Sequence, residues 1–299
     1  MPLEEIRKLL DRHARPDLTT AIEGVQVCRF GPASEPAAGM SGTVPAVIAQ
    51  GGKRLALGEH LFEYQPGQYL VTTVDLPVTG QVMATGAPTL GFGMSLEPTD
   101  IAALLLEADP RDLPPVAGDS PTGIAVTQAP EDLLEAIVRL LRLLDSPADR
   151  AILAPMIKRE ILWRLLRGEQ SGMIRQMGMA DSGLTHISRA VRWIRNNYAA
   201  AFRGEEPARV ADMSVSAFHR GFQAVTGMSP IQFQKRIRLQ EARLLLASHP
   251  SDITGVGLTV GYVSPSQFSR EYRRMFGTPP NQDAARLRSR PAETASVLP

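Results

Sequence analysis

A short sequence pattern occurs twice in the last third of this 299-residue chain, at an offset of fifty residues. The first copy, SVSAFHRGFQAVTGMSP, covers residues 214–230, and the second, SPSQFSREYRRMFGTPP, covers residues 264–280. The matching positions are Ser214 and Ser264, Ser216 and Ser266, Phe218 and Phe268, Arg220 and Arg270, Phe222 and Tyr272, Gly227 and Gly277, and Pro230 and Pro280. A solenoid stacks about three or more repeats, so two copies indicate one small unit that is present twice.

Each copy predicts a helix with defined ends. Ser214 and Ser264 are expected N-caps, because a hydroxyl oxygen there accepts a hydrogen bond from a free backbone N–H of the first turn. Gly227 and Gly277 are expected to end the helices, because glycine adopts a left-handed backbone conformation without strain.

A shorter helical stretch precedes each copy, at residues 205–211 and 252–260. In the first copy Phe218 and Phe222 lie four residues apart and are expected to point into a core, and the second copy repeats this spacing. The opposite faces carry Ser216, His219, Arg220 and Gln223 in the first copy, and Ser266, Gln267, Arg270, Arg273 and Arg274 in the second. A short helix, a turn and a capped helix with an outward polar face predict a helix-turn-helix, here present twice.

The segment between the copies, residues 230–246, predicts a helix that holds the two units at a fixed separation. Its apolar residues are expected to form one buried stripe, at Ile231, Ile237, Leu244 and Leu245. Basic residues flank this stripe at Lys235, Arg236, Arg238 and Arg243. Lys235 and Arg238, like Arg273 and Arg274, are expected to contact phosphate or to lie on the helix surface.

The formal net charge of +1 conceals a strong asymmetry along the chain. Residues 186–290 carry 16 Lys and Arg against 7 Asp and Glu, whereas residues 1–185 carry 16 against 23. A basic C-terminal part on an acidic body favours a polyanionic partner that is bound at one end only.

Residues 186–288 resemble the DNA-binding domain of the AraC/XylS family of bacterial transcription regulators. The resemblance is carried by Ala208, Ser214, Phe218, Phe222, Gly227, Pro230, Arg238, Ala242, Leu245, Leu246, Gly261, Tyr262, Ser264, Phe268, Phe276, Gly277 and Pro280. It implies two recognition helices that enter successive major grooves of double-stranded promoter DNA. By motif position, the base-facing residues would be Ser216, His219 and Arg220 in the first helix, and Ser266, Gln267 and Arg270 in the second.

Two positions depart from the family pattern. Pro207 stands where the family usually has a large aliphatic residue, and Gly257 stands where it usually has alanine. Proline is tolerated only in a first helical turn, so the helix around Pro207 is expected to start near Arg203 or Gly204. Gly255 and Gly257 would each cost about 1 kcal/mol relative to alanine inside a helix.

The N-terminal half alternates β-branched and aromatic runs with Gly- and Pro-rich turns, which predicts a small barrel or sandwich. The expected strands are residues 20–30, 46–57, 61–74, 80–84 and 90–96. Helices are expected at residues 3–14, 98–107, 130–144 and 146–168, with Ile152, Met156, Ile157, Ile161, Leu162 and Leu165 of the last one inward. The last two helices are expected either to cover the barrel or to form an oligomer interface.

Residues 63–82, EYQPGQYLVTTVDLPVTGQV, resemble the cupin-like effector domain of one AraC-type subgroup. The resemblance implies an α+β, cupin-like β-barrel with a helical hairpin, followed by an all-α domain with two helix-turn-helix motifs. The expected bounds are an effector-binding or dimerisation domain at 1–170, a linker at 171–183, a DNA-binding domain at 184–290 and a disordered tail at 291–299. An apolar effector pocket inside the barrel would be lined by Phe62, Tyr64, Tyr69 and Phe92.

Several kinds of chemistry lack their residues. A cupin metal site would need a second histidine where Phe62 follows His60, so no metal is expected. No catalytic Ser/His/Asp set and no phosphate-binding glycine loop are found, so neither catalysis nor a cofactor is expected. A cupin enzyme fused to a DNA-binding module is the alternative, and a ligand-free architectural protein is a third.

Compartment and partners follow from weaker signals. The single cysteine, Cys28, fits a reducing compartment and is expected to be a buried strand residue rather than a sensor. No apolar run is long enough to span a membrane, so the protein is expected in the cytoplasm, without a membrane partner. The expected partners are promoter DNA and a small-molecule effector, with RNA polymerase and a second copy of the chain as further candidates.

Overall fold

The computed structural model describes residues 1–31, 33–115, 123–248 and 252–289. The chain forms two compact units, one from Met1 to Thr185 and one that begins at His186. The predicted linker, residues 171–183, includes helix α5 (Ser171–Gly178), whose Met173, Ile174 and Met177 are buried. The predicted tail at residues 291–299 lies outside the described residues.

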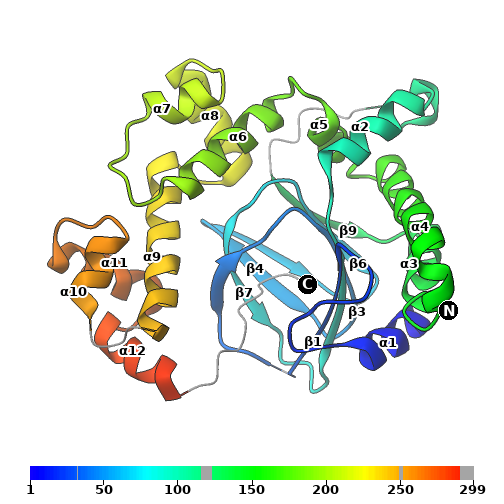
Figure 1. The fold of residues 1–299 in the computed structure, drawn as a ribbon, viewed down its shortest axis with the longest axis horizontal. Helices are drawn as coiled ribbons and strands as arrows, with labels where there is room; N and C mark the ends of the chain where they lie inside the picture. Colours follow the sequence, from blue (N-terminus) through cyan, green and yellow to red (C-terminus); the bar gives the residue numbers. More distant parts are fainter. Residues whose placement is uncertain (32, 116–122, 249–251, 290–299) are drawn as a thin grey trace. The chain divides into compact units, whose positions relative to one another are not determined.

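The first unit contains two antiparallel sheets (Figure 1), with strand orders β1-β8-β3-β6-β9 and β2-β7-β4-β5. The strands are β1 (Val25–Phe30), β2 (Ala37–Met40), β3 (Pro45–Gln50), β4 (Lys53–Leu57), β5 (His60–Tyr64), β6 (Gln68–Thr72), β7 (Pro77–Val82), β8 (Thr89–Met94) and β9 (Ile124–Gln128). No strand pairing joins the two sheets among the described residues, so the predicted barrel or sandwich takes the form of two sheets and not of a closed barrel. The arrangement is open but consistent with a cupin-like fold.

Two glycine turns divide segments that the sequence predicted as single strands. Gly51, at φ +79°, separates β3 from β4, and a Cβ there would lie 2.2 Å from the Thr89 hydroxyl oxygen. Gly67, at φ +84°, separates β5 from β6. Strands β2 and β9 were not predicted.

Several helices accompany the two sheets of the first unit. They are α1 (Pro2–His13), α2 (Pro98–Glu107), α3 (Glu131–Arg142) and α4 (Pro147–Arg167), with a 3-10 turn at Pro110–Asp112. Helix α1 packs on β1, β3 and β8, and α3 packs on both α1 and α4. The α3–α4 pair is thus joined to the sheet through α1, and the choice between a cover and an oligomer interface stays a prediction.

One part of the prediction for α4 is wrong. Ile152 and Met156 are 69% and 63% exposed, although they were expected to point inward. The buried face of α4 begins at Ala154 instead and continues through Ile161 and Leu165. In the first half of α4 the buried residue is therefore the small Ala154, and the larger Ile152 and Met156 face solvent.

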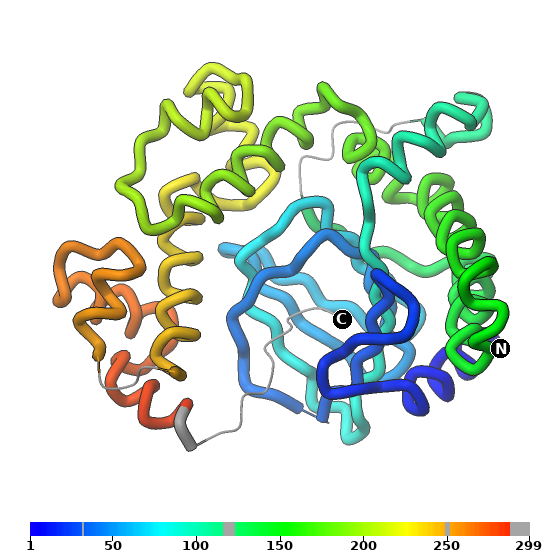
Figure 2. Tube along the Cα trace, in the orientation of Figure 1, coloured from blue at the N-terminus to red at the C-terminus, as the bar shows by residue number. Residues whose placement is uncertain are grey.

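The second unit is helical and is built on one long helix. Its elements are α6 (Gly183–Asn196, which begins just before the unit boundary), α7 (Glu205–Val210), α8 (Val215–Thr226), α9 (Pro230–Ser248), α10 (Ile253–Thr259), α11 (Pro265–Phe276) and α12 (Pro280–Ser289). Helix α9, drawn in yellow, lies between the α7–α8 pair and the α10–α11 pair (Figure 1, Figure 2).

Helix α9 is buried on more than one side. Phe233 packs edge-on against Phe222 of α8, with ring centroids 5.2 Å apart. Leu239, Ala242 and Leu246 instead join a cluster with α10 and α11. The predicted single stripe is wrong at two positions, because Ile231 and Leu244 are 46% and 63% exposed.

The predicted helix ends are confirmed. The Ser214 and Ser264 hydroxyls accept from the backbone N–H of Ala217 and Gln267, each at 3.3 Å. Gly227 and Gly277 both adopt the left-handed conformation.

The two departures from the family pattern are accommodated locally. Helix α7 has Gly204 at its N-cap, so Pro207 falls in the first turn, as expected. A Cβ at Gly257 would lie 3.0 Å from Cδ1 of Phe268, so this glycine permits the close packing of α10 on α11.

A buried carboxylate ties the end of the second unit to its core. The Asp283 side chain is fully buried and accepts from Tyr272 Oη at 2.8 Å, from Arg243 Nε at 2.9 Å and from Arg286 Nη2 at 2.9 Å. Burial alone would raise the pKa of Asp283, but these hydrogen bonds and positive charges outweigh it and lower the pKa.

We expect Asp283→Asn to lower the free energy of unfolding by about 2–3 kcal/mol, less than for a fully buried pair because both arginines remain partly hydrated. Since the folded pKa lies below the ordinary value of 3.8, the stabilisation is present above that value and is lost as the pH falls through the folded pKa. Urea unfolding of the full chain between pH 3 and pH 7 measures both effects. Glu241→Gln is the control, and an equal loss in that variant would contradict the assignment.

Candidate nucleic-acid interface

Helix α8 presents its predicted polar residues to solvent. Phe218 and Phe222 are fully buried and pack against each other with centroids 5.3 Å apart, which fixes the rotation of the helix. The opposite side is exposed at each predicted position, namely Ser216, His219, Arg220 and Gln223. These side chains are therefore free to meet a groove of DNA.

Helix α11 repeats this arrangement with one difference. Phe268 and Tyr272 are fully buried, and the exposed residues are Ser266, Arg270, Arg273 and Arg274. Gln267 is only half exposed, and its Nε2 donates to Oε1 of Glu271 at 3.1 Å. The Nε2 amide carries two hydrogens, so one N–H is held by Glu271 and the second is available to a base.

Glu271 is the centre of a polar network at the side of α11. Lys235 Nζ of α9 contacts it at 2.8 Å, and Tyr262 Oη donates to it at 2.7 Å. Burial would raise the pKa of Glu271, but the hydrogen bonds from Lys235, Gln267 and Tyr262 lower it. The charge of Lys235, which the sequence assigned to phosphate or to the helix surface, is therefore neutralised within the protein.

Arg238 also faces the protein, although the sequence grouped it with Lys235. Its Nε donates to the Tyr198 carbonyl at 2.6 Å and its Nη1 donates to the Gly261 carbonyl at 2.9 Å. Its Nη2 reaches the carbonyls of Ala200 at 2.7 Å and Ala199 at 3.4 Å. Backbone carbonyls cannot be recognised in a side-chain pattern, so these contacts could not be predicted from the residues alone.

The two helix-turn-helix motifs carry different charges. Residues 205–226, which cover α7 and α8, contain three carboxylates and two arginines. Residues 253–276, which cover α10 and α11, contain one carboxylate and three arginines. DNA phosphates attract cations and repel anions, so the second motif is the stronger electrostatic partner for DNA.

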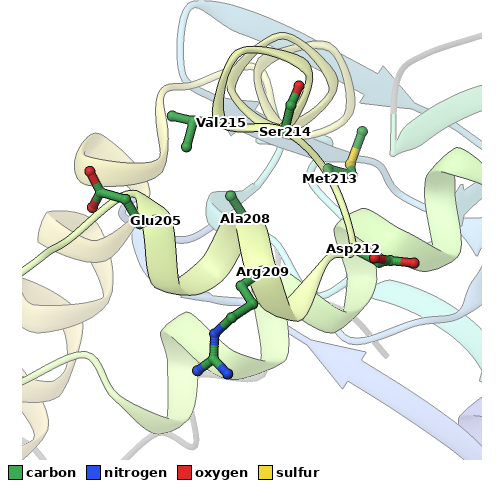
Figure 3. A pocket seen from close by; sticks show the side chains of 7 residues that line it. All are labelled: Glu205, Ala208, Arg209, Asp212, Met213, Ser214 and Val215. Carbon is green, nitrogen blue, oxygen red and sulfur yellow. The ribbon is translucent and has the colours of Figure 1, made fainter.

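A hollow of about 480 Å³ lies beside the turn between α7 and α8 (Figure 3). Its lining consists of Glu205, Ala208, Arg209, Asp212, Met213, Ser214 and Val215. The two carboxylates give this side of the first motif a negative character that the second motif lacks. None of the predicted site residues lines this hollow, whereas the predicted N-cap Ser214 does.

The four predicted effector residues do not share one interior. Phe92 pairs with Val27 and Val47, and Tyr69 also pairs with Val47, so Tyr69 and Phe92 lie on one face of the five-stranded sheet. A Cβ at Gly168 would lie 3.1 Å from Tyr69 Oη, which places this face against the end of α4. Burial raises the pKa of Tyr69 to about 12, and Glu169 adds to the shift.

Phe62 and Tyr64 lie on the face of the four-stranded sheet that turns toward the other sheet. Tyr64 pairs with Lys53, and Phe62 pairs with Leu55, so these side chains share one face. Lys53 and Tyr64 both interact electrostatically with Cys28. Side chains alternate along β1, so Cys28 points to the face of the five-stranded sheet that is opposite to the face of Phe92.

Lys53, Cys28 and Tyr64 form a buried polar cluster, which we call the interior cluster. Lys53 is 3% exposed, and its Nζ lies 4.1 Å from the centroid of the Phe30 ring. Tyr64 Oη is buried without a hydrogen-bond partner among the described residues. The sequence did not place Lys53 beside Cys28, although its alternation with Leu55 and Leu57 along β4 puts it on the apolar face.

Burial sets the protonation of the interior cluster. It raises the pKa values of the Cys28 thiol and the Tyr64 phenol, and it lowers the pKa of Lys53. The Cys28 thiol is therefore kept protonated, unlike a reactive cysteine. Among the described residues no three His, Cys, Asp or Glu side chains gather as metal ligands, and no helix has the length and apolarity needed to cross a membrane.

Comparison with known proteins gives matches to both units. Residues 21–173 match the family profile of the AraC-type transcriptional regulator N-terminus, and residues 208–286 match that of a helix-turn-helix domain. The transcriptional activator RhaS of Escherichia fergusonii is 26% identical over 151 residues, which are 50% of this chain and 53% of RhaS. The transcriptional regulator MtrA of Neisseria gonorrhoeae is 30% identical over 132 residues, which are 44% of this chain and 42% of MtrA.

The chain thus spans about half the length of the curated relatives it matches. Among solved structures, ToxT from Vibrio cholerae O395 superposes with a TM-score of 0.53 at 10% identity, and the match covers 90% of this chain and 100% of ToxT. At that identity the likeness concerns the fold alone.

We expect Lys53→Met to gain stability relative to the wild type as the pH falls from 10.5 toward 7, because methionine carries no charge that burial penalises. Folding lowers the pKa of Lys53, so the unfolded state binds more protons between the lowered value and the ordinary 10.5. Wild-type stability therefore rises with pH across that window, and the advantage of the variant shrinks toward pH 10.5. Urea unfolding at several pH values measures the difference between the two proteins.

Cys28 and Tyr64 titrate in both proteins and largely cancel in that comparison. The matched control is Lys8→Met, because the Lys8 side chain is 65% exposed and its removal should change stability by less than about 0.5 kcal/mol. A difference that stays constant with pH would show that Lys53 is not held against its charged form.

Proposed function

The chain belongs to the AraC-type family of transcriptional regulators, and from this premise we propose that it binds promoter DNA and controls transcription in response to a small-molecule effector. The observation that carries the proposal is the pair of capped helices α8 and α11, each with a buried aromatic face and an exposed polar face. The net positive charge of the second unit supports DNA as its ligand.

We assign the DNA contacts by chemistry and placement. The proposed contact residues are Ser216, His219, Arg220, Gln223, Ser266, Gln267, Arg270, Arg273 and Arg274. Arg220 and Arg270 occupy matching, exposed positions, and arginine is the commonest reader of guanine through O6 and N7. Arg273 and Arg274 lie in the last turn of α11, where phosphate contact is the better fit.

We expect Arg270→Ala to cost about 1–3 kcal/mol of specific binding and to relax the preference at one base pair. Arg273→Ala should instead weaken binding to all sequences alike and reduce the salt slope of log K by about 1. The measurement is selection from random duplexes followed by titration at two salt concentrations. Uniform weakening in Arg270→Ala would reassign that residue to phosphate.

The two motifs should contribute unequally. The carboxylates beside α8 oppose phosphate, so Arg220→Ala is expected to cost less affinity than Arg270→Ala in the same titration. If the full chain selects no sequence with or without effector, the DNA-binding proposal fails.

We further propose that the effector enters the first unit and places an acidic group at the interior cluster. Among the described residues Tyr64 Oη has no hydrogen-bond partner, and Lys53 adds a buried ammonium group to the same cluster. ToxT has been crystallised with an unsaturated fatty acid bound. A carboxylate on an apolar body is the ligand class that fits the chemistry of the cluster.

Oleate is the first probe of this assignment, with oleamide as its uncharged match. At 100 times its dissociation constant a ligand stabilises the folded state by about 2.7 kcal/mol, so oleate should raise the wild-type melting temperature and oleamide should not. Lys53→Met and Tyr64→Phe should each weaken the response, whereas Lys8→Met should keep it. An equal response in Lys53→Met would place the acid elsewhere.

RNA polymerase and a second copy of the chain stay predicted partners. The exposed stripe of Ile152, Leu153 and Met156 on α4 is compatible with the second of these. A transcription regulator without catalysis is the function that we propose, in keeping with the names of its curated relatives.

A further inference from the structure

The two connecting segments of the second unit touch backbone to backbone. Residues 197–204 lead from α6 into the first helix-turn-helix, and residues 260–264 form the turn of the second. Gly261 has φ +90°, and a Cβ built there would lie 2.2 Å from the Ala199 carbonyl oxygen and 2.8 Å from its carbonyl carbon. Only glycine permits this approach, because a side chain would collide with the other segment.

The Arg238 guanidinium lies where the two segments meet. It donates to Gly261 on one side and to Tyr198, Ala199 and Ala200 on the other, with distances from 2.6 to 3.4 Å. Gln234, one turn earlier on α9, donates to the Ala200 carbonyl at 2.9 Å. A planar guanidinium can serve carbonyls on two sides at once, whereas an ammonium group cannot reproduce that fork.

This junction continues into the second recognition helix. The Arg238 guanidinium lies 5.8 Å from the centroid of the Tyr262 ring, and Tyr262 Oη donates to Glu271 of α11. Glu271 also accepts from Gln267, a proposed DNA contact. The other end of the junction, residues 198–200, lies directly before the α7–α8 motif.

We propose that Arg238 is a positioning residue that fixes the orientation of α11 relative to α8 and thereby sets the spacing of DNA half-sites that the protein accepts. The inference rests on the proposed function, because spacing has meaning only if both helices bind DNA. A guanidinium that already donates to four carbonyls has little capacity left for a phosphate. Fixing the two helices before binding also avoids an ordering cost during binding.

The test uses full-length wild type, Arg238→Lys and Arg238→Gln. Each is titrated against the split sequence that wild type selects and against the same duplex with one base pair inserted or removed between its halves. One base pair turns a half-site by about 35° and shifts it by about 3.4 Å, so a fixed pair of helices should lose at least about tenfold in affinity. Both variants should lose less than about threefold on the altered duplexes, because their helices can adjust.

Arg236→Gln is the matched control, because it removes a positive charge from the same helix and Arg236 makes none of these carbonyl contacts. On the duplexes with altered spacing it should lose as much affinity as wild type does, a loss that we call the spacing penalty. This holds whatever the effect of the substitution on overall affinity or salt slope. Circular dichroism and urea unfolding establish that each protein is folded. If Arg238→Gln does not fold, Arg238→Lys decides the question, because it keeps the charge and loses the fork.

A wild-type spacing penalty in Arg238→Lys would overturn the proposal. If that penalty persists while the salt slope falls in Arg238→Gln, Arg238 is a phosphate contact. Failure of the proposed function looks different, since wild type itself would then select no split sequence, and the inference would fall with it.

Discussion

The second unit depends on a single helix that is buried on two sides. Phe233 of α9 packs against Phe222 of the first motif, while Leu239, Ala242 and Leu246 join the cluster of the second. Each motif is too small to bury its aromatic face alone, so both obtain their core from α9. The exposed faces of α8 and α11 are therefore consequences of what their opposite faces bury.

Local signals in the sequence were sufficient where a residue acts within one turn. Ser214 and Ser264 cap their helices and Gly227 and Gly277 end them, because these effects depend on the neighbouring backbone alone. The stripe predicted for α9 failed at Ile231 and Leu244, since a periodicity argument assumes one buried face. Helix α9 has two packing partners and violates that assumption.

Sheet interiors were harder to predict because they depend on pairing between distant strands. Tyr64 and Tyr69 are five residues apart, yet one faces the interior cluster and the other faces the helices. The register that separates them is set by pairing with β4, β3 and β9, which the sequence does not identify. The position of Lys53 beside Cys28 could not be predicted for a related reason, because it depends on how β4 and β1 face each other across the two sheets.

The contact between Gly261 and Ala199 has a consequence for how this domain can be divided. Arg238 joins the turn of the second motif to carbonyls that precede the first motif, about sixty residues earlier in the chain. The second motif is thus not a self-contained module. A chimera that exchanges the second motif between family members would also have to carry residues 198–200 and Arg238. Without them the transplanted helix would lack the contacts that orient it.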